Sequence, residues 1–135
     1  MRGDGQLDAK EYLMRYRESM ERTKEIGQHL AELKVEAVCL KDHEGRSIAL
    51  DHAMQKYVDA CDQSSAELNR LAALRAEIVG AIDGVESKTL RKILYRKYIL
   101  GETLEKIAAD MNYHYVSICR LHGAALHAVT ANIPA

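Results

Sequence analysis

Near the C-terminus, the side chains between residues 103 and 122 are of types that make hydrogen bonds and apolar contacts at the edges of nucleic-acid bases. Projected as an α-helix, the segment after His114 places one set of them outward. The outward residues are Val116, Ser117, Cys119, Arg120, Gly123 and His127, and Tyr115 lies at their border. The base-contacting set is Tyr115, Val116, Ser117, Cys119 and Arg120. A guanidinium can donate two hydrogen bonds to a guanine edge, and a valine can meet a thymine methyl group. We expect this set to contact DNA bases, although Arg120 also reads as an ordinary solvated arginine.

A second set has the chemistry to hold phosphates without reading sequence. It consists of Arg96, Lys97, Thr103, Lys106 and Tyr113. Cations, hydroxyl groups and the free N–H groups of a helix start are the usual phosphate partners, and such contacts position a protein on the duplex. We expect Lys106 to be the strongest of them. Each could equally be an ordinary solvated surface residue. The prediction therefore depends on these residues lying on the same side of the protein as Arg120.

Metal binding and catalysis are weaker interpretations of the same chain. Cys119 and His122 are three residues apart, with His114 and His127 nearby, but two ligands do not make a zinc site and no second pair has a matching spacing. The charged run at residues 42–44 lacks the fixed geometry that catalysis needs. No phosphate-binding glycine loop, HExxH helix or nucleophile elbow occurs. We expect no metal, no cofactor and no enzymatic activity.

Two short helices that meet at a tight turn would position the DNA-contacting residues. The inward residues are Leu104, Ile107, Ala108 and Met111 on the first helix and Ile118, Leu121, His122 and Ala125 on the second. The turn spans residues 111–113, where Asn112 tolerates a positive φ. This spacing is that of a helix-turn-helix, in which the second helix enters the major groove of DNA.

Residues 87–129 resemble region four of bacterial sigma factors and the small phage or prophage regulators related to it. The matching residues are Arg96, Lys97, Tyr98 and Ile99, then Gly101, Glu102, Thr103 and Leu104, then Glu105, Lys106, Ile107 and Ala108, and finally Ile118, Cys119, Arg120 and Leu121 with Ala125 and Leu126. The resemblance implies that the outward face of the last helix contacts promoter DNA. Two positions depart from the family: His114 replaces the usual capping Ser, and Gly123 stands where a charged residue is commoner.

Preceding this unit, the sequence predicts two long amphipathic helices. Over residues 7–40 the apolar stripe is Leu13, Tyr16, Met20, Thr23, Ile26, Leu30, Leu33, Ala37 and Leu40. From Asp51, the expected N-cap, a heptad seam follows with Met54, Tyr57, Cys61, Ser64, Leu68, Leu71, Arg75, Ile78, Ile82 and Val85. Gly84 is expected to end this helix in the left-handed conformation.

The charged segment at residues 41–47 is the predicted loop between these helices, which would fold back as an antiparallel hairpin. A third helix is expected over residues 88–100, capped by Ser87 and ended by Gly101, with Thr103 capping the next. The residues after Thr130 should fray. These boundaries predict two domains, a helical hairpin over residues 1–86 and the helix-turn-helix over residues 87–135.

Composition supports an all-α protein, because the chain of 135 residues contains one proline and no Phe or Trp. Residues 1–87 hold 12 Lys or Arg against 17 Asp or Glu, whereas residues 88–135 hold 7 against 3. A basic C-terminal part is what a phosphate backbone attracts. Three scattered cysteines and the lack of a long apolar run predict a reduced, soluble protein in the cytoplasm of a bacterial host.

Together these features predict a sequence-specific regulator of phage or prophage type that binds double-stranded DNA. Because two helices alone bury one stripe each, we expect the hairpin to form a homodimer or to dock on a partner such as RNA polymerase. Two alternatives stay open. In one, the C-terminal unit binds protein, as a sigma mimic or anti-sigma-like module would. In the other, the chain is a phage DNA-packaging recognition subunit.

Overall fold

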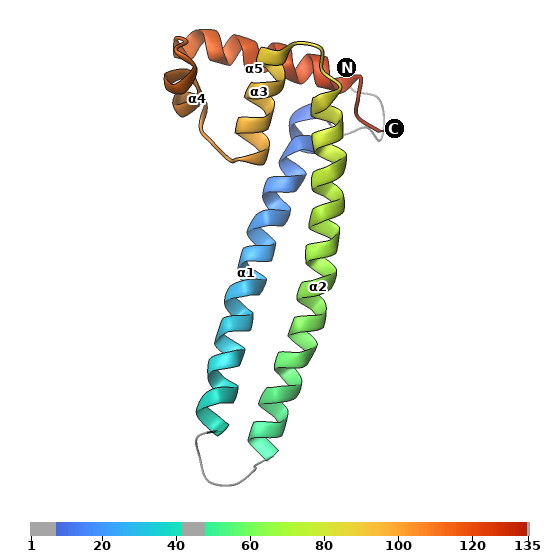
Figure 1. The fold of residues 1–135 in the computed structure, drawn as a ribbon, viewed down its shortest axis with the longest axis vertical. Helices are drawn as coiled ribbons and strands as arrows, with labels where there is room; N and C mark the ends of the chain where they lie inside the picture. The colour runs from blue at the N-terminus through green and yellow to red at the C-terminus, as the bar shows by residue number, and fades with distance from the viewer. Residues whose placement is uncertain (1–7, 42–47, 135) are drawn as a thin grey trace. The chain divides into compact units, whose positions relative to one another are not determined.

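The computed structural model describes residues 8–41 and 48–134, and helices account for most of that part of the chain (Figure 1). The elements are α1 (Ala9–Lys41), α2 (Ile48–Asp83), α3 (Lys88–Leu94), the π-helical segment η1 (Tyr95–Ile99), α4 (Leu104–Met111) and α5 (Tyr115–Thr130). No strand occurs in the two described ranges, so the predicted all-α class is confirmed. Leu7 and most of the predicted loop, including Asp42, His43 and Glu44, lie outside the described residues.

The chain divides into two compact units that do not follow the predicted boundary at residue 86. The first unit consists of residues 1–18 and 73–135, and the second of residues 19–72. The start of α1 and the end of α2 belong to the first unit because their side chains bond there. Tyr12 Oη donates to Glu77 Oε1 at 3.1 Å, and Arg17 Nη1 donates to the carbonyl of Ile99 at 3.2 Å.

The first unit has a core to which every helix contributes. The fully buried side chains are Leu13 of α1, Ile78 and Ile82 of α2, Ile93 and Leu94 of α3, Tyr98 of η1, Ile107 of α4, and Ile118 and Val129 of α5. The α3 and α4 helices both pack against α5. This core fixes α5 from its inner side and leaves its outer side free to act as a surface.

The predicted single helix over residues 88–100 is instead α3 followed by the π-helical segment η1. The N–H of Leu100 donates to the carbonyl of Tyr95 at 3.1 Å, which is an i→i+5 bond. In such a turn, residues five apart share a face. Two such pairs are buried, Ile93 with Tyr98 and Leu94 with Ile99. The extra residue in the turn therefore brings both pairs into the core, which a regular α-helix would not do.

Gly84 follows the end of α2 as predicted, but it does not adopt the left-handed conformation expected there. Among the described residues, positive φ values occur at Gly101 (75°) and Asn112 (60°), and Gly84 is not among them. A Cβ atom on Gly84 would lie 2.8 Å from the Asn132 side chain. Asn132 Nδ2 donates to the carbonyl of Ala81 at 3.1 Å. Gly84 thus allows a close approach, and the expectation that the tail frays after Thr130 is wrong at Asn132.

Tyr98 and His122 form a buried polar contact between η1 and α5. Tyr98 Oη lies 2.7 Å from Nε2 of His122, and the two rings stack with centroids 5.8 Å apart. Burial, with the charge of Asp8, raises the pKa of Tyr98 to about 12. Burial, followed by the positive charges of Lys97 and Lys10, lowers the pKa of His122 below its ordinary value of 6.5. The pair therefore favours a neutral imidazole.

This shift predicts a loss of stability in mild acid. Because the folded-state pKa of His122 is depressed, its contribution is complete above the unfolded value of 6.5 and falls as the pH drops toward the folded value. Thermal unfolding followed from about pH 7.5 to about pH 5 should show a falling midpoint. The variant His122→Gln, which cannot titrate, should show a shallower fall. Identical slopes for the two proteins would contradict the assignment.

In the second unit α1 and α2 lie side by side and antiparallel, with Lys56 Nζ 3.9 Å from Glu36 Oε1. Over the whole of α1, the predicted stripe is buried or half-buried at every position, so it is confirmed. The predicted α2 seam is wrong at Met54 and Leu68, which are exposed. The buried positions of α2 in this unit are Leu50, Ala53 and Ala60.

Small side chains at Ala53 and Ala60 allow close helix packing, which accounts for their burial while Met54 and Leu68 stay exposed. Arg75, also predicted in the seam, is exposed in the first unit and donates to Tyr95 Oη at 3.1 Å. The predicted N-cap is wrong too. The α2 helix already begins at Ile48, which places Asp51 in its first turn, where a carboxylate favours the helix dipole.

Candidate nucleic-acid interface

The corner between α4 and α5 has a defined backbone geometry. Thr103 caps α4 by accepting a hydrogen bond from the Lys106 N–H at 3.2 Å. Asn112 follows the helix with φ 60° and ψ 40°, which confirms the prediction of positive φ at this residue. Its N–H donates to the carbonyl of Ala109 at 3.4 Å, and the Tyr113 N–H donates to that of Ala108 at 3.0 Å. These are the two bonds of a Schellman motif, which satisfies the last carbonyls of α4.

The inner faces of the two helices meet in a small apolar cluster. Ile93, Ile107, Ala108 and Ile118 are buried there, with Leu104, Met111 and Leu121 partly buried against them. Ala125 is fully buried and His122 is half-buried. The inward orientation predicted for α5 is therefore confirmed. Because Ala108 and Ile118 sit in the same cluster, the register of α5 against α4 is fixed, and so is the face that α5 turns outward.

The base-contacting set predicted on α5 is exposed at three of its five positions. Val116 is 63% exposed and Tyr115 is 48% exposed. Arg120 is exposed as well, whereas Ser117 and Cys119 are half-buried. These last two are less accessible than the other three, and their contacts with DNA bases stay a prediction. No Asp or Glu occurs in α5, so its outer face carries no negative side chain.

Tyr115 is held by two neighbours at the start of α5. Its hydroxyl hydrogen-bonds with the Cys119 thiol, and this bond is the main cause of a raised pKa at Tyr115. The nearby carboxylate of Glu105 on α4 contributes to the same shift. His114 occupies the N-cap position of α5 but makes no side-chain cap hydrogen bond. The first-turn N–H groups of α5 are thus not capped by that side chain.

Arg96, predicted to contact phosphate, is instead engaged by two carboxylates. Its Nε and Nη2 donate to Glu102 at 2.5 and 3.1 Å, and Nη2 also bonds Asp110. These bonds, Glu102 first, raise the pKa of Arg96 above its ordinary value and lower those of Glu102 and Asp110. The Arg96 side chain is only 17% exposed. The network ties η1 to α4, so the Arg96 charge is compensated within the protein.

The other predicted phosphate contacts differ in their exposure and in their hydrogen-bond and ion-pair partners. Lys106 is exposed and its Nζ lies 3.2 Å from Asp110 Oδ2 in an i,i+4 pair. Tyr113 is 42% exposed at the corner, and Thr103 is exposed with its hydroxyl used as the helix cap. Lys97 is half-buried and its charge acts on His122, which places it toward the inner side of α5. Lys106, Thr103 and Tyr113 are therefore exposed, whereas Lys97 and Arg96 are half-buried.

The carboxylates that surround these cations were not predicted from the sequence. The Lys106–Asp110 pair was detectable, because opposite charges four residues apart on a helix commonly meet. The two bonds of Arg96 were not, since they depend on the π-helical turn and on the placement of α4. The effect of Glu105 on Tyr115 likewise joins two helices and has no local signature.

Comparisons with known proteins were made against protein-family models, curated proteins and solved structures. None of the three found a match for this chain. Within residues 8–41 and 48–134, no group of three or more His, Cys, Asp or Glu is arranged to hold a metal ion. None of the helices in the same ranges is long and apolar enough to span a membrane.

Proposed function

We propose that the protein is a sequence-specific regulator of transcription, of phage or prophage type, that binds double-stranded DNA through α4 and α5. In this proposal the two helices and the Asn112 corner act as a helix-turn-helix, and α5 enters the major groove. The observation that carries the proposal is the outer face of α5. It presents exposed Val116 and Arg120 on a helix without acidic residues, and buried Ile118 fixes its orientation.

The charges of the first unit fit this proposal when Arg96 and Lys97 are set aside as phosphate contacts. Arg96 then braces η1 against α4, and Lys97 adds positive potential near α5. Lys106, Thr103 and Tyr113 are the predicted phosphate contacts that remain exposed. Residues 88–135 carry an excess of four positive charges, 7 Lys or Arg against 3 Asp or Glu. Such an excess attracts a phosphate backbone and makes binding sensitive to salt.

In this proposal the hairpin of α1 and α2 carries the partner contacts. It joins a second copy of the chain and is available to a protein partner such as RNA polymerase. The DNA-contacting and partner-contacting residues then belong to the two different compact units, residues 1–18 with 73–135 and residues 19–72. Either function can be tested without disturbing the other.

Selection of bound duplexes from a random DNA pool, with the full chain as bait, tests the proposal. A recovered motif, with an affinity that falls steeply between about 50 and 200 mM salt, is the expected result. A pool that stays random with equally salt-sensitive binding would reduce the proposal to non-specific DNA binding. No binding at the lower salt concentration would overturn it.

Removing the negative charge beside the reading helix should strengthen DNA binding. The carboxylate of Glu105 lies near Tyr115 at the start of α5, where it would repel a phosphate. We expect Glu105→Gln to raise the affinity for all duplexes by roughly two- to fivefold at low salt, with less gain at high salt. Fluorescence anisotropy with a selected and a random duplex measures this. A loss of affinity would place Glu105 outside the phosphate path.

One observation favours a second candidate, a protein-binding role for the same surface. Tyr113, Tyr115 and Val116 are each between 42% and 63% exposed, and aromatic side chains are enriched in protein interfaces. A sigma mimic or anti-sigma-like module would use them as apolar anchors. Its binding would depend weakly on salt. Val116→Ala would weaken it strongly by removing an apolar anchor, whereas DNA binding would lose only one apolar base contact.

A further inference from the structure

The α2 helix carries a second, largely apolar stripe that its pairing with α1 leaves exposed or half-buried. Its members are Met54, Val58, Cys61, Ser65, Leu68 and Ala72, spaced by four and three residues in alternation. We call this set the outer stripe. Met54, Val58 and Leu68 are each 44% to 51% exposed. Six positions in heptad spacing over 18 residues form a seam about 27 Å long, and such a seam is built to pack against another helix.

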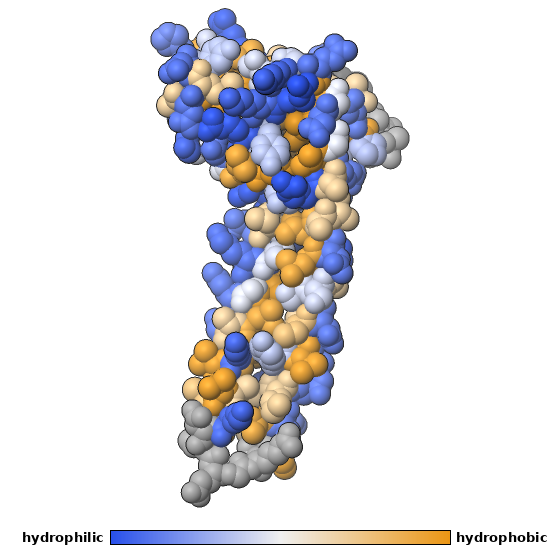
Figure 2. Space-filling view, in the orientation of Figure 1, coloured by the Kyte–Doolittle hydropathy of each residue, from blue (hydrophilic) through white to orange (hydrophobic). Residues whose placement is uncertain are grey.

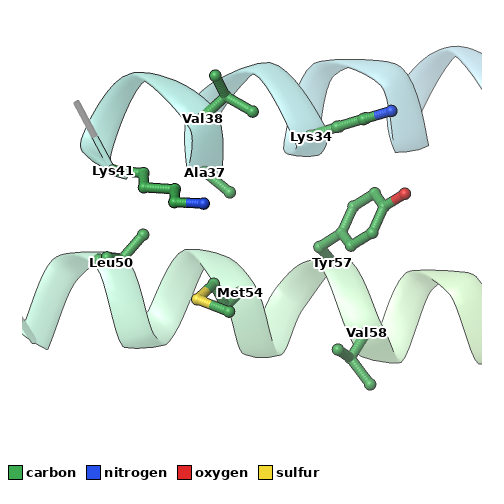
Figure 3. A pocket seen from close by; sticks show the side chains of 8 residues that line it. All are labelled: Lys34, Ala37, Val38, Lys41, Leu50, Met54, Tyr57 and Val58. Atoms are coloured by element: carbon green, nitrogen blue, oxygen red, sulfur yellow. The ribbon is translucent and has the colours of Figure 1, made fainter.

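A groove between α1 and α2 continues the outer stripe toward α1. It has a volume of about 200 Å³ and is lined by Val38 of α1 and by Met54, Tyr57 and Val58 of α2, with Lys34 and Lys41 beside them (Figure 3). Val38 is 50% exposed. Figure 2 shows hydrophobic residues gathered along both helices of this unit. The exposed apolar surface therefore includes residues of both helices.

We propose that the outer stripe and this groove form the surface on which a second copy of the chain packs, giving a four-helix bundle from two helix pairs. The inference rests on the part of the proposed function that gives the hairpin a partner, and it is independent of the DNA contacts. A second copy brings the same heptad seam, so each α2 packs into the groove of the other. This is the self-complementary contact of a two-fold dimer.

The charges at the edges of the surface fit this occupant. Lys34 and Lys41 line the groove on the α1 side. Asp62, which is exposed, lies at the edge of the outer stripe, because it is four residues after Val58 and three before Ser65. An α2 helix that enters the groove of the other copy brings its Asp62 toward these lysines. This charge complementarity would determine which partner binds and in which register, more than how tightly it binds.

Elsewhere in the second unit, α1 and α2 present a polar surface that would remain in water. There a shallow hollow is lined by Glu32 and Glu36 of α1 and by Lys56, Asp59 and Gln63 of α2. An apolar seam on one side and charge on another lets two copies close on each other without offering a second seam. The expected assembly is therefore a closed dimer rather than an open array.

Sedimentation equilibrium of the full chain tests the proposal. We expect the wild type to be a dimer at micromolar concentration. The double variant Val58→Glu and Leu68→Glu should associate roughly a hundred-fold more weakly or worse, because it would bury charge in the seam. Its helicity by circular dichroism should be unchanged, because both side chains are exposed in the single chain. The matched control is Ala66→Glu, an exposed position on the same helix outside the outer stripe, which should stay dimeric. A monomeric wild type, or a double variant that stays dimeric, would overturn the proposal.

Charge reversal tests the register separately. Lys34→Asp should weaken dimer association by roughly tenfold, and adding Asp62→Lys should restore it. The control Lys56→Asp, on the polar surface, should leave the measured mass that of a dimer. If the double variant Lys34→Asp and Asp62→Lys stayed as weakly associated as Lys34→Asp alone, the proposed packing would be excluded. DNA selection reports on the other unit. A dimer without a recovered motif would refute only the DNA function, and a monomer that selects a motif would refute only this inference.

Discussion

Replacing Arg120 by Ala is expected to reduce the preference for the selected DNA site over random duplex by roughly 10- to 100-fold, the worth of one bidentate base contact. Arg120 is exposed on the outer face of α5. The change should therefore leave the unfolding midpoint and the affinity for random duplex nearly unaltered. Competition binding with the selected and the random duplex measures the ratio of the two affinities. An unchanged ratio would show that Arg120 is a solvated surface residue.

Lys106→Ala is the matched comparison, because it removes a cation from the same surface without removing a base contact. It should weaken binding to both duplexes by the same factor and lower the salt slope by about 1. Asp110 shares the Lys106 ammonium at 3.2 Å, so the loss should be smaller than for an unpaired lysine. If Lys106→Ala and Arg120→Ala changed the two affinities in the same way, the division between phosphate and base contacts would be wrong.

Features that depend on neighbouring residues could be predicted from the sequence. Ser87 and Thr103 cap α3 and α4 as expected, because a hydroxyl needs only the N–H three residues ahead. Asn112 takes a positive φ for an equally local reason. The α1 stripe followed from periodicity, since one face of that helix is apolar and the others are charged.

Features that depend on a distant partner could not be predicted. The arc of apolar residues on α2 is wider than one neighbouring helix covers, so periodicity did not decide whether Ala53 or Met54 faces α1. The π-helical turn at η1 responds to burial of Tyr98 and Ile99 together, which is a requirement of the core. For the candidate site, the exposed positions of α5 followed from its period. The carboxylates around Arg96 did not, because Glu102 and Asp110 reach it across a turn and a second helix.

Ile118→Ala should cause the largest loss of stability among the substitutions on α5, by about 2–5 kcal/mol. Ile118 is fully buried in the cluster with Ile93, Ile107 and Ala108, and its removal leaves a cavity where α5 rests on α4. Chemical denaturation of the full chain measures the loss. Because the register of α5 depends on this contact, DNA affinity should fall together with stability.

Val116→Ala is the control for that loss, because Val116 lies on the same helix only two residues away but is 63% exposed. Its effect on the free energy of unfolding should stay within about 0.5 kcal/mol. If α5 reads DNA, Val116→Ala should still lower affinity for sites with a thymine at its contact, through the lost methyl contact. A stability loss at Val116 equal to that at Ile118 would mean that the outer face of α5 is covered by protein. In that case no duplex could reach Arg120.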